Sequence, residues 1–176
     1  AINQAANATV ATGSATYNPE TCTLTLNGFS YSGAGALIKG QNYAAIGTTA
    51  TELNIVLAGA NSITCSGDDG NGIYATNNIN ISGSRADSLT ISSGSNGIYT
   101  SGGKLSVKNT EVKIAAAGRN GFDVKGFTAD NAVIDMAGVV NIGIFSADVH
   151  ISICNKSQVK ISADYKAVYA YNSHIT

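Results

Sequence analysis

Aromatic side chains recur in this sequence at nearly regular intervals, each directly after an apolar residue. The aromatic positions are Tyr74, Tyr99, Phe145 and Tyr169, and Asp123 occupies the equivalent place between Tyr99 and Phe145. Successive members of this stripe lie 22–25 residues apart, as in a structural repeat. Exposed rings on a rigid sheet stack against the apolar faces of sugars, while nearby Asn, Ser and Thr side chains bond to hydroxyls. We expect these five residues and Lys125 to bind polysaccharide. The alternative is that the rings pack on one another and bind nothing.

Cleavage of a polysaccharide would need more acidic groups than this stripe supplies. Glycosidases use two carboxylates that converge on one groove, and lyases combine an acidic cation-binding cluster with a base. Asp123 with Lys125 and Arg119 is the nearest approach to a lyase site, and no second carboxylate shares that face. We therefore expect a non-catalytic module, with a polysaccharide lyase or hydrolase as a third alternative.

Metal binding has two candidate places in the sequence. The loop 66-SGDDGN-71 carries Asp68, Asp69 and Asn71, whose oxygens are of the type that calcium prefers. Neighbouring carboxylates in a turn usually diverge, so a solvated turn is the simpler interpretation. His150 and His174 lie one repeat apart, but a metal site normally needs three or four ligands. We expect no cofactor, with calcium at the 66–71 loop as a weak candidate.

An internal repeat positions these residues. Three series of apolar residues recur with a period of about 22–26 residues. In the second and third series each member before Ile175 is followed two positions later by another apolar residue. The first is Ile73, Ile98, Phe122, Ile144, Val168; the second is Ile79, Leu105, Phe127, Ile151, Ile175; the third is Leu89, Val112, Ile134, Val159. An Asn-Gly pair precedes the first three members of the first series and is expected to make a turn.

Each repeat thus holds three short apolar-polar-apolar runs, which is the period of strands with one buried face. Such a unit cannot bury its own edge, so the units must stack with like strands parallel. The sequence therefore predicts an all-β, right-handed parallel β-helix with three faces and about 22–26 residues per coil. The phase extends one coil backward, where 53-LNIVL-57 aligns with 79-INI, and 63-ITC-65 aligns with 89-LTI.

The two ends of the chain depart from the repeat. Residues 15–33 read as a strand, a turn at Asn18-Pro19 and a longer strand, which predicts an N-terminal capping hairpin. We assign 1–14 to a linker or N-terminal extension, 15–176 to a single β-helix domain, and 34–50 to a first coil with an irregular face. The chain stops in mid-coil, and an open coil edge invites pairing. We expect the remainder of a longer chain, or end-to-end self-association, to cover it.

Composition excludes two classes of partner. Only 12% of residues are charged and the formal net charge is -1, so nucleic acid has no basic surface to bind. No run approaches the roughly 18 apolar residues of a membrane span, so we expect no membrane insertion. Cys22, Cys65 and Cys154 match no zinc or redox spacing, and at least one of the three thiols must be unpaired within the chain.

Several phrases resemble a known family. The segments 16-TYNPETCTLTLNG-28 and 52-ELNIVLAGANSITCSG-67, followed by GIY, INISG and SLTIS, look like the secreted and cell-surface carbohydrate-binding-domain β-helix proteins of anaerobic Gram-positive bacteria. The resemblance covers about residues 15–118. It implies an extracellular or cell-surface bacterial module without catalytic activity, and in some members calcium-assisted binding of acidic plant polysaccharide of the pectin type. The alternative is a structural stalk or adhesin repeat domain with no glycan ligand.

Overall fold

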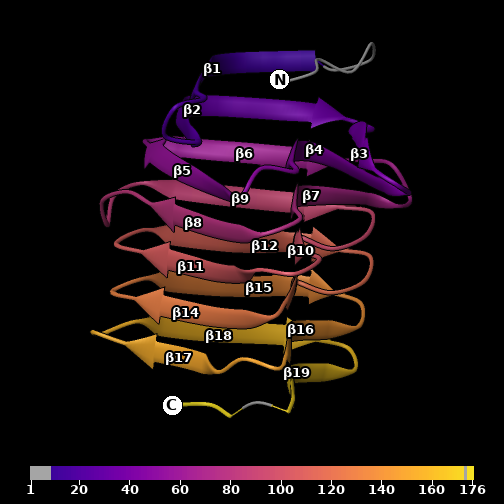
Figure 1. Ribbon diagram of the computed structural model, residues 1–176, viewed down its shortest axis with the longest axis vertical. Coiled ribbons are helices and arrows are strands. Elements are labelled where there is room, and N and C mark those ends of the chain that lie inside the picture. Colours follow the sequence, from indigo (N-terminus) through magenta and orange to yellow (C-terminus); the bar gives the residue numbers. More distant parts are fainter. Residues whose placement is uncertain (1–8, 173) are drawn as a thin grey trace.

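The described chain, residues 9–172 and 174–176 of a computed structural model, is a three-faced parallel β-solenoid of about five coils (Figure 1). The first face stacks β5 (Glu52–Ala58), β8 (Asn78–Ser82), β11 (Lys104–Lys108), β14 (Gly126–Asp130) and β17 (Ile151–Cys154). The second stacks β6 (Ala60–Cys65), β9 (Ser88–Ser93), β12 (Glu111–Ala117), β15 (Val133–Val139) and β18 (Gln158–Ala163). The third stacks β4 (Asn42–Thr48), β7 (Gly70–Ala75), β10 (Ile98–Thr100), β13 (Phe122–Val124), β16 (Ile142–Ala147) and β19 (Lys166–Tyr171).

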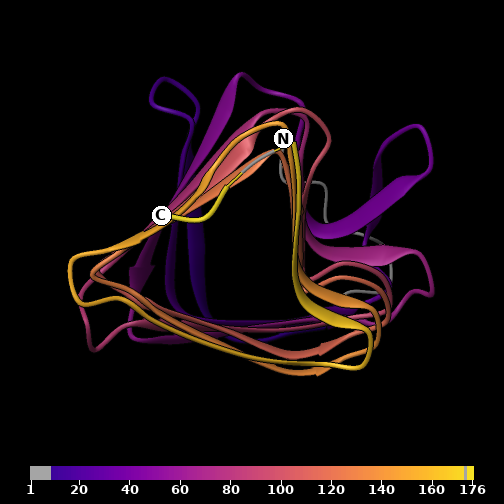
Figure 2. The ribbon, with the colours of Figure 1, turned by 90° about the horizontal axis from the view of Figure 1, so that it is seen from below.

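The coils wind in the predicted hand. Figure 2 is seen from the C-terminal end, and the chain runs anticlockwise around the triangle while it advances toward the reader. This is a right-handed coil, as the preference for right-handed parallel crossovers predicts. Among the described residues no helix is long and apolar enough to cross a membrane.

The predicted register is confirmed along all three series of apolar residues. On the third face Ile98 pairs with Ile73 on one side and Phe122 on the other, and Leu105 and Val112 have the equivalent predicted neighbours on the first and second faces. One earlier alignment is wrong by two residues, because Leu89 pairs with Asn61 rather than Ile63. The pairing is shifted because the turn 83–87 is longer than the turn at Gly59. A shift by two residues, an even number, keeps Ile63 facing inward.

The alternation of side chains builds a single core inside the triangle. Residues at every second strand position are buried, and the polar residues between them face outward. Aromatic side chains fill the middle coils, where the ring centroids of Phe122 and Phe127 lie 5.3 Å apart. All members of the three series from Ile73 to Ile151 are buried, so the repeat carries the hydrophobic core.

A hairpin caps the N-terminal end, as expected. β1 (Thr9–Asn18) pairs antiparallel with β2 (Thr23–Gly33), and the turn is closed by the Glu20 N–H, which donates to Oδ1 of Asn18 at 2.9 Å. The hairpin begins at Thr9, so residues 9–14 belong to it rather than to an extension, and residues 1–8 lie outside the described residues. β2 bends at Gly28, where φ is 54°, and pairs with both β5 and β6.

The expected irregular face is a second hairpin. β3 (Ala36–Lys39) pairs antiparallel with β4, which in turn pairs parallel with β7. Figure 2 shows this purple hairpin projecting outward beyond the outline of the coils, on the side of the third face. The hairpin therefore forms a border at the N-terminal end of that face.

The glycines of the Asn-Gly pairs are required for a reason other than the expected one. Gly72, Gly97 and Gly121 do not have a left-handed φ, so backbone conformation does not select them. A Cβ on Gly97 would lie 2.7 Å from the Gly121 carbonyl oxygen and 2.7 Å from Cδ1 of Ile114. Close approach between neighbouring coils and the core therefore excludes a side chain at this corner.

At the C-terminal end the stacking stops at one short pairing. Ile175 pairs with Ile151, and the Thr176 N–H donates to the Ile151 carbonyl at 2.9 Å. The apolar side chains of β18 and β19 that point inward, such as Ile161 and Val168, are only half-buried here. The expectation that further chain or a second copy covers these strands stays a prediction.

Candidate binding face on the third sheet

The five residues of the predicted stripe lie in register on the outer side of the third face. Tyr74, Tyr99, Asp123, Phe145 and Tyr169 pair in this order across five neighbouring strands. The rings contact each other in two pairs, with centroids 5.5 Å apart for Tyr74 and Tyr99 and 5.6 Å apart for Phe145 and Tyr169. Asp123 lies between the two pairs, and we call this series the ring column.

The prediction that Tyr74 binds polysaccharide is wrong, because only 1% of its surface is exposed. The residue paired with it on β4 is Gly47, and a Cβ there would lie 2.3 Å from Cγ1 of Ile38. Ile38 of β3 thus lies against the outer face beside Tyr74, whose hydroxyl donates to Oγ of Ser101 at 3.5 Å. The β3–β4 hairpin closes this end of the ring column, and the Tyr74 ring is not available to a ligand.

The remaining members of the ring column keep part of their surface in solvent. Tyr99, Asp123 and Phe145 are half-buried, and Tyr169 is 37% exposed. The rings therefore pack on one another, as the alternative interpretation held, and still present a surface. A ligand can contact the column from Tyr99 to Tyr169.

Asp123 places an acidic group in the middle of the ring column. Its Oδ2 accepts a hydrogen bond of 3.0 Å from Nδ2 of Asn120. Burial between the rings raises the pKa of the Asp123 carboxyl, while the Asn120 hydrogen bond and the charges of Arg119 and Lys125 act in the opposite direction. Burial also raises the pKa of the Tyr99 hydroxyl, and the negative charge of the Asp123 carboxylate raises it further.

The predicted lyase group is brought together only in part. Lys125 Nζ forms an ion pair of 3.2 Å with Oδ2 of Asp148, and both residues lie in the turns between the third and the first face. Arg119 is exposed in the turn before β13. In the described part of the ring column Asp123 is the single carboxylate, which suits a hydrogen-bond acceptor for hydroxyl groups better than a pair of catalytic acids.

The structure adds three residues that the sequence interpretation missed. Tyr165 and Tyr171 are 66% and 52% exposed, and Lys166 Nζ lies 4.9 Å from the Tyr165 ring centroid and 4.4 Å from that of Tyr169. Tyr171 follows Tyr169 by two residues, so strand alternation already places it on the same side. Tyr165 lies in a turn, where no periodic signal exists. Together they extend the aromatic surface at the C-terminal end of the ring column.

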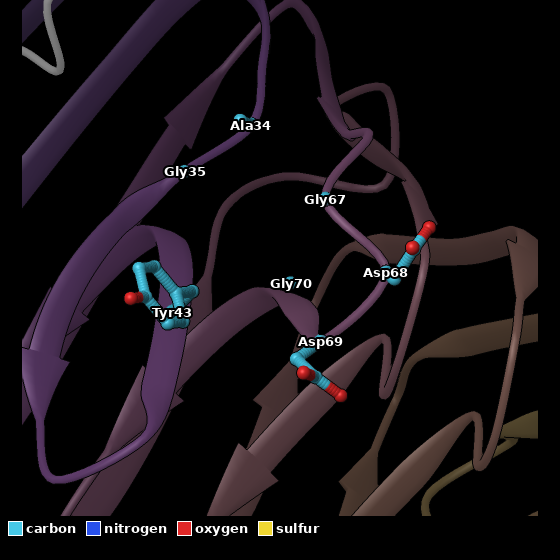
Figure 3. A pocket seen from close by; sticks show the side chains of 7 residues that line it. All are labelled: Ala34, Gly35, Tyr43, Gly67, Asp68, Asp69 and Gly70. Carbon is cyan, nitrogen blue, oxygen red and sulfur yellow. The ribbon is translucent and has the colours of Figure 1, made fainter.

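The predicted calcium ligands do not converge. Asp68 and Asp69 line a pocket of about 280 Å³ beside Tyr43, but their carboxylates point in different directions (Figure 3). Asn71 is buried instead, where its Nδ2 donates to the Tyr43 carbonyl at 3.0 Å and its Oδ1 accepts from Nδ2 of Asn96 at 3.0 Å. Asn71 is therefore a structural residue, and the predicted set of three ligands is wrong in this member.

The other metal candidates are equally sparse. The described residues contain no group of three or more His, Cys, Asp or Glu side chains that could hold a metal ion. His150 and His174 lie on the surface, with ring centroids 3.4 Å apart. Cys22, Cys65 and Cys154 are free thiols.

Comparison with known proteins leaves the family open. No protein-family model, curated protein or solved structure shows a significant match to this chain. The resemblance to the carbohydrate-binding-domain β-helix proteins stays a prediction.

Proposed function

We propose that the outer side of the third face binds polysaccharide and that the protein is a non-catalytic extracellular or cell-surface module. The observation that carries the proposal is the interruption of the ring column at Asp123. Tyr99 and Phe145 are two strands apart, roughly 9.6 Å at the usual strand spacing. A carboxylate is shorter than the rings on either side, so a sugar ring can lie over Asp123 with its apolar face against an aromatic ring.

Hydrogen bonding supports the same site. The ionised Asp123 carboxylate accepts hydrogen bonds from sugar hydroxyls, and Lys125 donates to groups at the edge of the sheet. The exposed Tyr169 ring supplies a further stacking surface, and the half-buried Lys166 beside that ring supplies a positive charge for an acidic sugar. Because β13 and β16 are paired with a strand on each side, Asp123 and Phe145 are held in place before a ligand arrives, which lowers the entropic cost of binding.

The first experiment is a glycan array of neutral and acidic polysaccharides, with and without a chelator. Binding of any glycan supports the proposal, and loss of that binding in chelator would assign calcium a role. No binding across the array would refute it in favour of a structural stalk or adhesin repeat. Release of unsaturated or reducing ends from a bound polysaccharide would instead identify a lyase or hydrolase.

The second experiment locates the binding face on this protein. Phe145→Ala removes one ring beside Asp123 and is expected to weaken glycan affinity about 5- to 10-fold, the usual size of an aromatic contact. Tyr43→Ala is the matched control, because Tyr43 is an exposed ring on β4 outside the ring column. Isothermal titration calorimetry measures both. Equal affinities for the wild type and Phe145→Ala would place the binding elsewhere.

A further inference from the structure

A ladder of asparagines runs along the corner that leads into the third face. Asn71, Asn96 and Asn120 are buried, and Asn141 continues the series. In the regular rungs each side-chain amide donates to the asparagine one coil earlier: Asn96 Nδ2 donates to Asn71 Oδ1 at 3.0 Å, and Asn141 Nδ2 donates to Asn120 Oδ1 at 3.1 Å. The ladder thus satisfies buried polar groups from coil to coil.

Asn120 departs from this pattern. Its backbone N–H donates to Asn96 Oδ1 at 3.3 Å, as a regular rung requires, but its side-chain Nδ2 donates to Oδ2 of Asp123 at 3.0 Å. A carboxylate is a stronger acceptor than a neutral amide oxygen, which explains why Asp123 takes this donor. The hydrogen bond connects the buried ladder to the ring column on the outer face.

We infer that Asn120 is a positioning residue for Asp123: it holds Oδ2, directs Oδ1 toward the ligand, and returns its amide to Asn96 when Asp123 is protonated. The ligand part of this inference rests on the proposed function, whereas the link between Asn120 and Asp123 does not. Glycan binding at this site is then pH-dependent, because only the ionised carboxylate accepts two hydrogen bonds from hydroxyl groups while Asn120 holds it.

The charged and titratable groups around Asp123 come from each neighbouring element. Tyr99 faces it from β10, and Arg119 lies in the preceding turn. Lys125 directly follows β13 and pairs with Asp148, and Phe145 on β16 carries no charge. Arginine, lysine and tyrosine keep their ionisation state in mild acid. A change in the chemical shift of the Asp123 carboxyl carbon in mild acid therefore reports the protonation of Asp123 itself. The Asp148 carboxyl carbon has its own resonance and is followed separately.

Two ladder variants test the link without any ligand. Asn120→Ala and Asn96→Ala each remove one rung, but only the first removes a hydrogen bond to Asp123. The titration of the Asp123 carboxyl carbon, followed by NMR, is expected to move to higher pH in Asn120→Ala, which loses the hydrogen bond to the ionised carboxylate. It is not expected to move to higher pH in Asn96→Ala, which loses only the acceptor to which the Asn120 amide returns. An unchanged Asp123 titration in Asn120→Ala, or the same change in both variants, would overturn the inference.

A measurement on the wild type covers the case in which Asn120→Ala does not fold. The side-chain amide resonances of Asn120 are expected to shift with the same midpoint as the Asp123 carboxyl, and those of Asn71 to remain constant through that range. If the Asn120 amide does not respond to the titration, the two side chains are not coupled and the inference fails.

Glycan affinity as a function of pH tests the second half. Wild-type affinity is expected to fall about tenfold as Asp123 is protonated, the size of one hydrogen bond to a charged group, and in Asn120→Ala this fall moves to higher pH. Affinity that is constant across the Asp123 titration would refute the pH-dependence. If the array finds no glycan while the NMR coupling is observed, the proposed function fails and the positioning role of Asn120 stands.

Discussion

Replacing Gly97 with alanine tests how closely the coils of this solenoid approach one another. The new Cβ would lie 2.7 Å from the Gly121 carbonyl oxygen and 2.7 Å from Cδ1 of the buried Ile114. The Gly121 oxygen accepts the Ile98 N–H at 3.0 Å, so it cannot retreat without weakening the pairing of two coils. The backbone at residue 97 and the Ile114 side chain therefore have to shift to relieve both contacts, which strains the structure.

The expected magnitude follows from two opposing effects. Overpacking of a tight core costs about 1–3 kcal/mol, and the loss of glycine freedom in the unfolded chain returns about 0.4–1 kcal/mol. We expect Gly97→Ala to lower the free energy of unfolding by about 1–2 kcal/mol and the Tm by about 2–8 °C for a chain of this length. Circular dichroism of the β signal during heating measures the change.

A matched glycine in an open turn provides the control. A Cβ on Gly102 would meet only the Thr76 carbonyl oxygen, at 3.1 Å, and Gly102 does not have a left-handed φ. Gly102→Ala is expected to change stability by about 0.5 kcal/mol at most. If Gly97→Ala unfolded at the same temperature as Gly102→Ala, close approach of the coils would not be the reason for glycine in the Asn-Gly pairs.

Two further predictions concern the ring column. Tyr74→Ala is expected to lower the free energy of unfolding by about 3–5 kcal/mol, because the ring is buried, and urea unfolding measures this change. Glycan affinity, measured by calorimetry at temperatures where the variant is folded, is expected to stay unchanged. Weaker binding would mean that the hairpin opens. Asp123→Asn is expected to raise the Tm more at pH 7 than at pH 4. The folded-state pKa of Asp123 lies above the unfolded value, so the wild type loses stability as pH rises from the unfolded to the folded pKa, and the variant does not. A larger gain in acid would contradict this sign.

The repeat made most of the fold predictable. Apolar residues two apart specify which side of a strand is buried, and the regular period of the three series specifies its neighbours, so pairs such as Ile98 with Phe122 follow from the sequence alone. The alignment of Ile63 failed because turns between faces differ in length without changing the strand pattern. A shift of two residues preserves the buried side, so the core was correct where the pairing was not.

Exposure was harder to predict than register. The sequence places Tyr74 and Tyr99 in equivalent positions, but their surroundings differ because only Tyr74 lies on β7, the strand that pairs with β4 of the β3–β4 hairpin. Residues 34–50 carry no repeat, so nothing in their pattern shows that Ile38 lies against the outer face at Gly47. The burial of Tyr74 is a tertiary effect of a segment outside the repeat.

An aspartate at position 123, where the other members of the ring column are aromatic, has two structural consequences. An aromatic residue at this point would continue the ring column and leave Asn120 free to make a regular rung to Asn96. The carboxylate interrupts the rings on the outer face and, as the stronger acceptor, also draws the Asn120 amide out of the ladder inside. The sequence shows only the first effect, because the second joins a corner residue to a strand residue three positions later. Burial of the Asp123 carboxyl raises its pKa, so keeping it ionised at this place costs stability. The pair of Asn120 and Asp123 therefore supports the proposal that this point of the third face serves recognition.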